Sequence, residues 1–244
     1  MSAPSPVKNL QEALIFLRSE LIKASLEYEQ ILAIDRPVNY YLIMAVSHDT
    51  RERIIEVAKK RFHQRSYADV GIKEICDEAH IQKGSFYHFF PSKRDLVLTV
   101  IDEFAADWAD GFVGEAFDPA LPPMDRIDYV IDAAYFWQKS VKDIQGHLPG
   151  CLFGNLALEV STQDDILRAK LTAVFTHAKS RFRDTLDEAV EQGAIPALDS
   201  DATAEAMLAY LEGMILIAKA QNDAEVIYRL GPALKTIRIE TSGH

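Results

Sequence analysis

Cysteine, glycine and proline are all scarce in this chain. Among its 244 residues there are 2 cysteines, 11 glycines and 10 prolines. Two cysteines, Cys76 and Cys151, provide no disulfide framework, and no apolar run reaches the roughly 18 residues that a membrane span needs. The few helix breakers leave long segments in which apolar residues recur with the period of an α-helix. We therefore expect an all-α, soluble, cytoplasmic protein without a membrane partner.

The chain also lacks the sequence motifs of common enzymes. It has no glycine-rich phosphate loop and no GxSxG, HExxH or CxxC motif, and its seven histidines do not pair at the spacing of metal ligands. The paired ExxH motif of di-iron helical bundles is missing as well. We expect no catalytic residue, no metal site and no cofactor, and we interpret the many acidic residues as helix caps and solvated surface.

Positive charge is in short supply, since the formal net charge is −11. It is concentrated, however: residues 44–95 carry a net charge of +2, whereas residues 96–244 carry −12. An acidic body would repel DNA everywhere except at the basic segment, so this asymmetry favours DNA binding by residues 44–95. A net charge of +2 on a short segment also fits ordinary variation. Whether residues 44–95 bind DNA therefore has to be judged from their residue pattern.

That pattern predicts two short helices separated by a tight turn. Ile72, Ile75 and Ala79 form an apolar stripe on the first helix, and Phe86 and Phe90 form one on the second. The opposite face of the second helix holds groups that reach phosphates and base edges rather than groups that fill a core. These groups belong to Lys83, Gly84, Tyr87 and His88.

A third helix follows at once. Pro91 ends the second helix because it lacks an N–H and restricts the residue before it. Ser92 and Asp95 form a capping box that starts the next helix. The free amides of that first turn, together with Lys93 and Arg94, predict an anion site suited to a DNA phosphate.

Residues 48–95, and above all the run KGSFYHFFPSK, resemble the N-terminal DNA-binding domain of the TetR family of transcriptional repressors. The resemblance implies a helix-turn-helix head at residues 46–95 and a helical ligand-binding and dimerisation domain at residues 96–244. It also implies a ligand-responsive, sequence-specific repressor that binds an inverted-repeat operator in double-stranded DNA as a homodimer. Carried across residue by residue, the family's DNA contacts fall on Lys73, Lys83, Gly84, Ser85, Tyr87, His88 and Lys93.

Three residues depart from the family's pattern. Gly71 replaces the Ser or Thr that commonly caps the second helix of the head, His80 replaces a turn glycine, and Gln82 replaces the Ser or Thr that commonly starts the recognition helix. Glycine can still cap a helix through its backbone, and histidine tolerates a left-handed turn. We count Gln82 among the predicted DNA contacts because its amide can read adenine.

The segment in front of this unit has two parts. Residues 50–65 predict a supporting helix whose basic residues form a solvated face, with phosphate contacts by Arg51 and Lys60 as the alternative. The face holds Arg51, Lys59, Lys60 and Arg65. Residues 1–45 form an N-terminal extension with an amphipathic segment but without a signal peptide. It fits either a genuine arm or a start of translation placed too early, since Met44 offers another start.

The larger domain is expected to hold a small-molecule effector. Leu96 begins a helix that links head and body, and aromatic residues follow that serve either a core or a pocket. The loop DIQGHLPGCLFGN resembles a subgroup of the family with a Gly-Cys-Leu signature, some members of which sense electrophiles or oxidants through this cysteine. Candidate effector or sensor residues are Trp108, Phe136, Trp137, His147, Cys151 and Asn155.

Cys151 has two competing interpretations. At a helix N-terminus its thiolate would be stabilised and the pKa of its thiol lowered, as a sensor requires, and His147 is close enough in sequence to assist. The alternative is a small residue packed against the linking helix.

The last long helices are expected to build the dimer. The resemblance implies that a helix ending at Gln192 and a second helix at residues 202–221 form a four-helix bundle with their two-fold mates. The predicted interface residues are Phe175, Phe182, Leu186, Met207, Tyr210, Leu211 and Met214. Two further functions stay open at this point: an activator or non-inducible DNA-binding protein of the same fold, and a helical enzyme or carrier.

Overall fold

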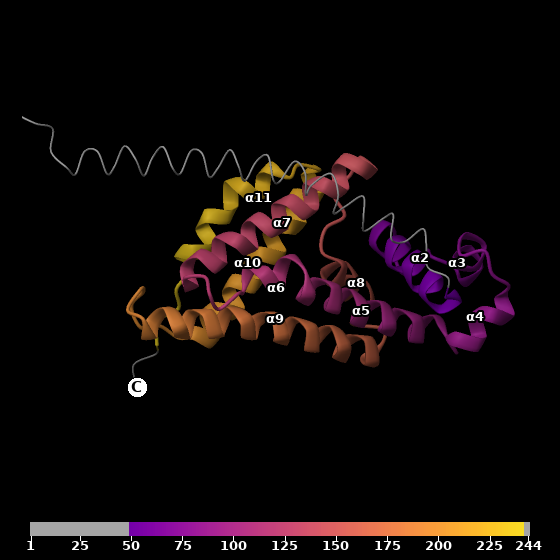
Figure 1. Cartoon of the computed structure of the whole chain (residues 1–244), viewed down its shortest axis with the longest axis horizontal. Coiled ribbons are helices and arrows are strands. Elements are labelled where there is room, and N and C mark those ends of the chain that lie inside the picture. The colour runs from indigo at the N-terminus through magenta and orange to yellow at the C-terminus, as the bar shows by residue number, and fades with distance from the viewer. Residues whose placement is uncertain (1–48, 242–244) are drawn as a thin grey trace, which may run out of the picture. The chain divides into compact units, whose positions relative to one another are not determined.

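The computed structural model describes residues 49–241, and the expected N-terminal extension at residues 1–45 lies outside that part. Figure 1 shows an all-helical arrangement, which confirms the predicted fold class. No strand occurs within the described range. The elements are α2 (Thr50–Gln64), α3 (Ile72–Glu78), α4 (Lys83–Phe89), α5 (Lys93–Asp110), α6 (Phe112–Ala116), α7 (Pro123–Gln145), α8 (Leu152–Val160), α9 (Asp165–Glu191), α10 (Ser200–Gln221), α11 (Glu225–Leu230) and the 3-10 helix η1 (Gly231–Thr236).

Helices α2, α3 and α4 share one apolar core, which we call the head core. Ile54 and Phe62 of α2, Ile75 of α3, Phe86 of α4 and Leu96 of α5 are at most 1% exposed. Large apolar side chains buried this completely are a main source of stability in so small a unit. Because α5 supplies part of this core, the division predicted after residue 95 falls inside a continuous helix; the division itself stays a prediction.

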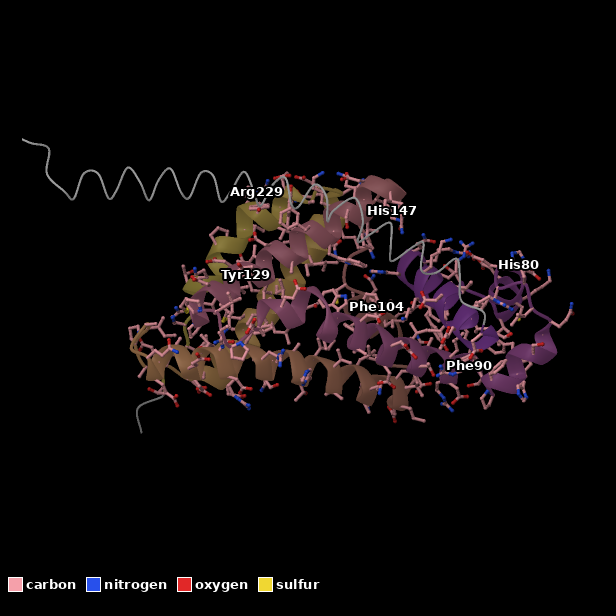
Figure 2. The ribbon with its side chains drawn as sticks, viewed as in Figure 1. His80, Phe90, Phe104, Tyr129, His147 and Arg229 are labelled. Carbon is pink, nitrogen blue, oxygen red and sulfur yellow. The ribbon has the colours of Figure 1, made fainter. Side chains whose placement is uncertain are left out.

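Short-range signals set the ends of these helices. Asp49 caps α2 by accepting a hydrogen bond from the amide of Arg51 at 2.8 Å, and Ser92 caps α5 by accepting one from the amide of Asp95 at 3.2 Å. The Ser92 hydroxyl also donates to the Asp95 carboxylate at 2.6 Å, so the predicted pair is present. His80, labelled in Figure 2, has φ 54° between α3 and α4, as expected of the residue that replaces a turn glycine.

One residue expected on the solvated face of α2 lies inside the protein. Lys59 is 4% exposed, and its ammonium lies 2.8 Å from the carboxylate of Asp107 in α5 and 3.3 Å from that of Glu56. The prediction of a solvated Lys59 is therefore wrong. A carboxylate 48 residues away gave no signal in the local pattern, and the ion pair between the buried Lys59 and the exposed Asp107 joins α2 to α5.

The body is built on the long helix α9, which packs against α5, α7, α8 and α10. Helices α9 and α10 form an antiparallel pair, with the Lys179 ammonium 2.9 Å from the Asp201 carboxylate. Gly193 has φ 69° just beyond the end of α9 at Glu191. In the described part of the chain, none of the helices is long and apolar enough to cross a membrane.

Candidate nucleic-acid interface and body core

Helix α4 has one face fixed in the head core and one face turned to solvent. Phe86 and Phe90 are buried with their ring centroids 5.9 Å apart, which fixes the rotation of the helix. On the other face Tyr87 is 45% exposed, and the Lys83 ammonium lies 5.8 Å from the centroid of the Tyr87 ring. The predicted contact residues Gln82, Lys83, Gly84 and His88 are exposed as well, and Ser85 is half-buried.

Gly84 has no structural requirement for glycine inside the protomer. Its backbone φ is not positive, and a Cβ added at this position would meet no atom within 4 Å. Glycine in a helix destabilises it relative to alanine by roughly 0.5–1 kcal/mol. A bare backbone on the exposed face of α4 therefore fits close approach by something outside the protomer.

Lys73 is almost fully exposed, whereas Lys93 in the first turn of α5 is held by the protein. Lys73 is 89% exposed and lies 3.5 Å from Asp77, a surface pair that contributes little. In α5 the half-buried Lys93 donates a hydrogen bond to the carbonyl of Tyr67, and its burial lowers its pKa. Arg94 lies 3.4 Å from the carboxylate of Asp164. Both cations of the expected phosphate site thus have partners within the protein that lie far away in sequence.

Basic residues of α2 pair with acidic residues of α3. The Lys60 ammonium lies 3.0 Å and the Arg61 guanidinium 2.5 Å from the carboxylate of Glu78. Arg65 lies 2.7 Å from Glu74. These pairs link α2 and α3 at the surface, and they occupy Lys60, which had been considered for a phosphate contact.

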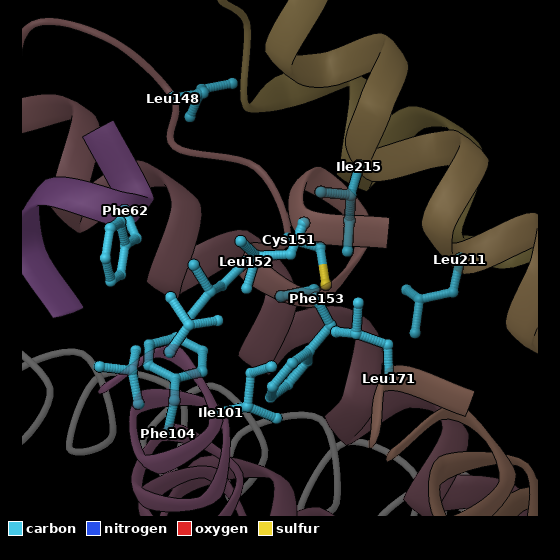
Figure 3. Close-up of a cluster of buried hydrophobic side chains, with 14 of the residues drawn as sticks. Phe62, Ile101, Phe104, Leu148, Cys151, Leu152, Phe153, Leu171, Leu211 and Ile215 are labelled. Atoms are coloured by element: carbon cyan, nitrogen blue, oxygen red, sulfur yellow. The ribbon is translucent and has the colours of Figure 1, made fainter. Parts of the chain in front are cut away.

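Five aromatic rings from four helices meet where the head joins the body, and we call them the aromatic cluster: His63 of α2, Phe104 and Trp108 of α5, Trp137 of α7 and Phe153 of α8. The Phe104 ring lies 5.5 Å from His63, 6.0 Å from Trp108, 6.4 Å from Trp137 and 5.5 Å from Phe153, centroid to centroid. Figure 3 shows Phe104 and Phe153 in the buried surroundings that they share with Phe62 and Ile101. The structure thus brings the predicted effector residues Trp108 and Trp137 together.

His63 was not singled out from the sequence, yet it links the head to the body. Its Nε2 lies 3.1 Å from the carbonyl oxygen of Gly150. Burial lowers the pKa of His63 to about 4, so the imidazole is neutral at neutral pH. Gln138 of α7 donates to the same carbonyl at 3.0 Å and accepts from the Gly150 amide at 3.1 Å.

The other predicted effector residues lie in different surroundings. Phe136 packs against Tyr135 with centroids 5.3 Å apart, and His147 is exposed beyond the end of α7 (Figure 2). Asn155 of α8 accepts a hydrogen bond from the Lys219 ammonium at 2.9 Å and donates one to the carbonyl of Pro149 at 3.1 Å. Phe136 and His147 are thus not brought into the aromatic cluster.

Cys151 lies at a helix N-terminus, and its surroundings favour the packing interpretation over the sensor interpretation. It is the N-cap of α8, and its sulfur accepts from the amide of Gly154 at 3.5 Å. The thiol is buried, and burial together with the neighbouring carboxylate of Glu212 raises its pKa well above the ordinary value. Burial, together with the carboxylate of Glu212 from the distant helix α10, outweighs the stabilisation that a helix N-terminus gives a thiolate. Figure 3 shows the sulfur packed among apolar side chains.

The residues expected at the dimer interface lie largely inside the protomer. The side chains of Phe182, Leu186, Met207 and Met214 are buried, and Leu211 is 9% exposed. Phe175 is half-buried. The hydroxyl of Tyr210 donates to the carbonyl of Leu230 at 2.9 Å. These side chains hold α9 and α10 against the rest of the body.

Other apolar residues of α9 and α10 are exposed. On α10, Leu216 is 51% and Ile217 43% exposed, and a Cβ at Gly213 would meet no atom within 4 Å. On α9, Ile166 is 52% exposed. Ala209, Gly213, Leu216 and Ala220 follow one another at helical spacing along one side of α10. We call this set of residues on the two helices the apolar face.

Comparisons with known proteins agree with this geometry. The family described as "Bacterial regulatory proteins, tetR family" matches residues 54–100, and the "Tetracyclin repressor-like, C-terminal domain" matches residues 123–234. The transcriptional regulator AcuR of Cereibacter sphaeroides is 33% identical over 172 residues, which cover 70% of this chain and 76% of AcuR. The HTH-type transcriptional repressor DhaR of Mycobacterium sp. (strain GP1) is 28% identical over 176 residues, 72% of this chain and 85% of DhaR.

A solved structure shows the same fold. The regulatory protein TetR from Rhodobacter sphaeroides superposes with a TM-score of 0.67 at 29% identity, covering 76% of this chain and 97% of that one. The helix-turn-helix head, the helical body and these relatives define a DNA-binding transcriptional regulator. The chain belongs to the TetR family of transcriptional repressors, and the relatives named above are regulators rather than enzymes.

Proposed function

We propose that this chain is a ligand-responsive, sequence-specific repressor that acts as a homodimer on an inverted-repeat operator. The observation that carries the proposal is α4, whose apolar face is locked by Phe86 and Phe90 while Lys83, Gly84 and Tyr87 face solvent. In this arrangement Lys83 reaches base edges, Tyr87 reaches a phosphate, and Gly84 lets the DNA backbone approach closely.

The remaining predicted contacts keep secondary roles. Gln82, Ser85 and His88 flank the same face, and Lys73 on α3 supplies a mobile positive charge. For Lys93 the proposal changes, since its ammonium already binds the carbonyl of Tyr67. We assign it to the support of the head.

The apolar face supports the dimer. Leu216, Ile217 and Ile166 present large exposed apolar side chains, and Gly213 and Ala209 leave room for a second backbone to approach. A two-fold contact of this face would bring four helices together and pair two heads. Paired heads suit half-sites about one helical turn of DNA, or 34–36 Å, apart.

The aromatic cluster supports an effector site at the junction of head and body. A small molecule that wedges between Trp108, Trp137 and Phe153 would displace groups that contact His63 of the head. A coupling of about 1–3 kcal/mol is enough for a 5- to 150-fold change in operator affinity. Such an effector would favour a spacing of the two heads that the operator does not accept.

The Gly-Cys-Leu signature suggests a second mode of response, through Cys151. The raised pKa of this buried thiol speaks for a packing role instead. Once an effector is known, the Cys151→Ser variant distinguishes the sensor role of Cys151 from a packing role. A sensor requires that effector response be lost while operator affinity is kept, and an unaltered response would exclude it.

The proposal is tested by DNA selection with the purified protein. Duplexes enriched from a random pool should converge on one inverted repeat, and a gel-shift titration against random DNA of equal length should show selective binding by a dimer. Binding without any sequence preference would contradict the proposal and favour a non-specific DNA-binding protein. A reporter gene placed behind the selected sequence then distinguishes repression from activation.

A further inference from the structure

Tyr67, in the turn between α2 and α3, is held from two sides by parts of the protein that are far apart in sequence. Its amide donates a hydrogen bond to Glu159 at 2.7 Å. Its carbonyl accepts one from the Lys93 ammonium, which also lies 4.1 Å from the centroid of its ring. Its ring lies 5.6 Å from that of Phe62 in the head core. The amide, the carbonyl and the ring of Tyr67 are thereby engaged.

Glu159 belongs to the body, in the last turn of α8. Its carboxylate accepts from the Ser66 hydroxyl at 2.5 Å and from the amide of Ala68 at 2.6 Å, in addition to the Tyr67 amide. Burial alone would raise the pKa of Glu159, but these hydrogen bonds and the charge of Lys93 lower it. The group is therefore ionised at neutral pH, and charge-assisted bonds of this kind are about twice as strong as neutral ones.

Lys93 belongs to the head, as the first residue of α5. Only Phe90, Pro91 and Ser92 separate it from the end of α4. The position of Lys93 therefore determines the position of the short connection between α4 and α5. Through Tyr67, a carboxylate of the body is connected to the residue that follows the proposed recognition helix.

Helix α8 contacts the head a second time, at its other end. The carbonyl of Gly150, just before α8, accepts from His63 of α2. A nine-residue helix is about 13 Å long and moves as one rigid piece. The loop before α8 thus contacts the last turn of α2, and the last turn of α8 contacts the turn between α2 and α3.

We propose that Glu159 is a positioning residue for the DNA-binding head, and that Tyr67 is the point through which α8 fixes the junction of α4 and α5. The inference rests on the proposed DNA-binding function. A head held in this way is ordered before it meets DNA, so less conformational entropy is lost on binding. Movement of α8 would break these contacts and leave the head less ordered.

The sign of the effect makes the proposal testable. Removal of a negative charge near DNA should by itself strengthen binding to any sequence. Loss of a positioning residue should instead weaken binding to the preferred sequence, by about 3- to 30-fold for Glu159→Ala. Glu159→Gln keeps one acceptor oxygen and should lose less. The control is Glu191→Gln at the end of α9, where an exposed carboxylate is replaced with the same change in net charge. This variant should not weaken binding.

The experiment uses the full chain and a duplex that the wild-type protein has selected from a random pool. Dissociation constants are measured for the wild type and these variants at a temperature where circular dichroism shows each to be fully folded. Unchanged or tighter binding by Glu159→Ala would overturn the proposal. Failure of the wild type to select any duplex would instead count against the proposed function.

Hydrogen exchange without DNA provides the second measurement. In Glu159→Ala the amides of Tyr67 and Ala68 should exchange faster because they lose their acceptor, and the amides of residues 92–97 should follow if Tyr67 transmits the change. Faster exchange confined to Tyr67 and Ala68 would reduce Glu159 to a local cap and overturn the inference. This measurement does not require the operator sequence.

Discussion

The Nε2 of His63 lies 3.1 Å from the carbonyl oxygen of Gly150, and this hydrogen bond joins a helix of the DNA-binding head to the loop that precedes α8. A carbonyl oxygen only accepts, so the Nε2 of His63 carries the proton. Because the ring is buried and stacked 6.3 Å from Trp137, a positive charge on it would be unfavourable.

The buried His63 predicts a pH-dependent stability. Its pKa is about 4 in the folded protein and 6.5 in the unfolded chain, so the unfolded state binds the proton more readily between these values. Stability from this residue is complete above pH 6.5 and is lost as the pH falls toward 4. With one pKa unit worth 1.36 kcal/mol, the loss amounts to about 3 kcal/mol.

The measurement is urea unfolding of the wild type and of His63→Gln across this pH range. Glutamine retains an N–H for the Gly150 carbonyl but does not titrate, so its free energy of unfolding should fall less steeply with decreasing pH. Carboxylates titrate in both proteins and cancel in the comparison. Identical slopes would show that His63 is not the group responsible.

Gly84→Ala should change stability and DNA binding in opposite directions. The added methyl meets no atom within 4 Å in the protomer, so helix propensity should stabilise the head by up to about 1 kcal/mol. Operator affinity should fall, because the methyl occupies the space that DNA approaches. Thermal unfolding and a binding titration on the same preparation test both statements, and undiminished affinity would remove Gly84 from the interface.

Lys83 and Lys93 should respond differently to truncation. Lys83→Ala should leave stability unchanged and weaken binding to the operator by about 1–3 kcal/mol, with less effect on random DNA. Lys93→Ala should lower the free energy of unfolding, since Tyr67 loses a hydrogen bond to its carbonyl. The exposed Lys139 of α7 is a matched control, and Lys139→Ala should alter neither property. Equal losses on operator and random DNA for Lys83→Ala would contradict the assignment to base edges.

The apolar face predicts a dimer that charge can separate. The double variant Leu216→Glu and Ile217→Glu introduces carboxylates where a partner would have to desolvate them, and it should sediment as a folded monomer. Tyr129→Glu, at a position 50% exposed on α7, provides the control and should leave the sedimentation coefficient unchanged. If the double variant remains a dimer, the interface lies elsewhere.

Cys151 should react slowly in the folded protein. Burial and Glu212 raise the pKa of its thiol, and each unit of increase lowers the thiolate fraction tenfold. In a Cys76→Ser background, alkylation by iodoacetamide at pH 7 should therefore be at least about tenfold slower in the folded protein than in urea. Rapid alkylation of the folded protein would support the sensor interpretation.

The features that the sequence predicts correctly are those fixed by near neighbours. The spacing of Phe86 and Phe90 determines which face of α4 is buried, and Ser92 with Asp95 determines where α5 begins. His80 adopts its left-handed turn because neither helix beside it can continue through it. In each case the interacting groups lie within a few residues of each other, so the local pattern contains the information.

The predictions that fail concern partners from distant parts of the chain. Lys59 looks like a solvated cation until Asp107 is brought beside it. The phosphate contact of Lys93 stays a prediction, but the carbonyl of Tyr67 already accepts a hydrogen bond from its ammonium. Cys151 lies at the helix N-terminus that its position predicted, but burial, together with Glu212 of α10, raises the pKa of its thiol. The helical spacing of Leu186 likewise marks a buried stripe without revealing whether the same protomer or a second copy covers it.

The continuity of α5 limits how members of this family can exchange parts. Leu96 and Val97 are buried beside the head, and Ile101 and Phe104 lie at its junction with the body, all on one helix. A recombination at residue 95 would join a foreign head to a helix whose buried side chains were selected to fit another one. A chimera with a stable head therefore has to carry α5 together with its own α2.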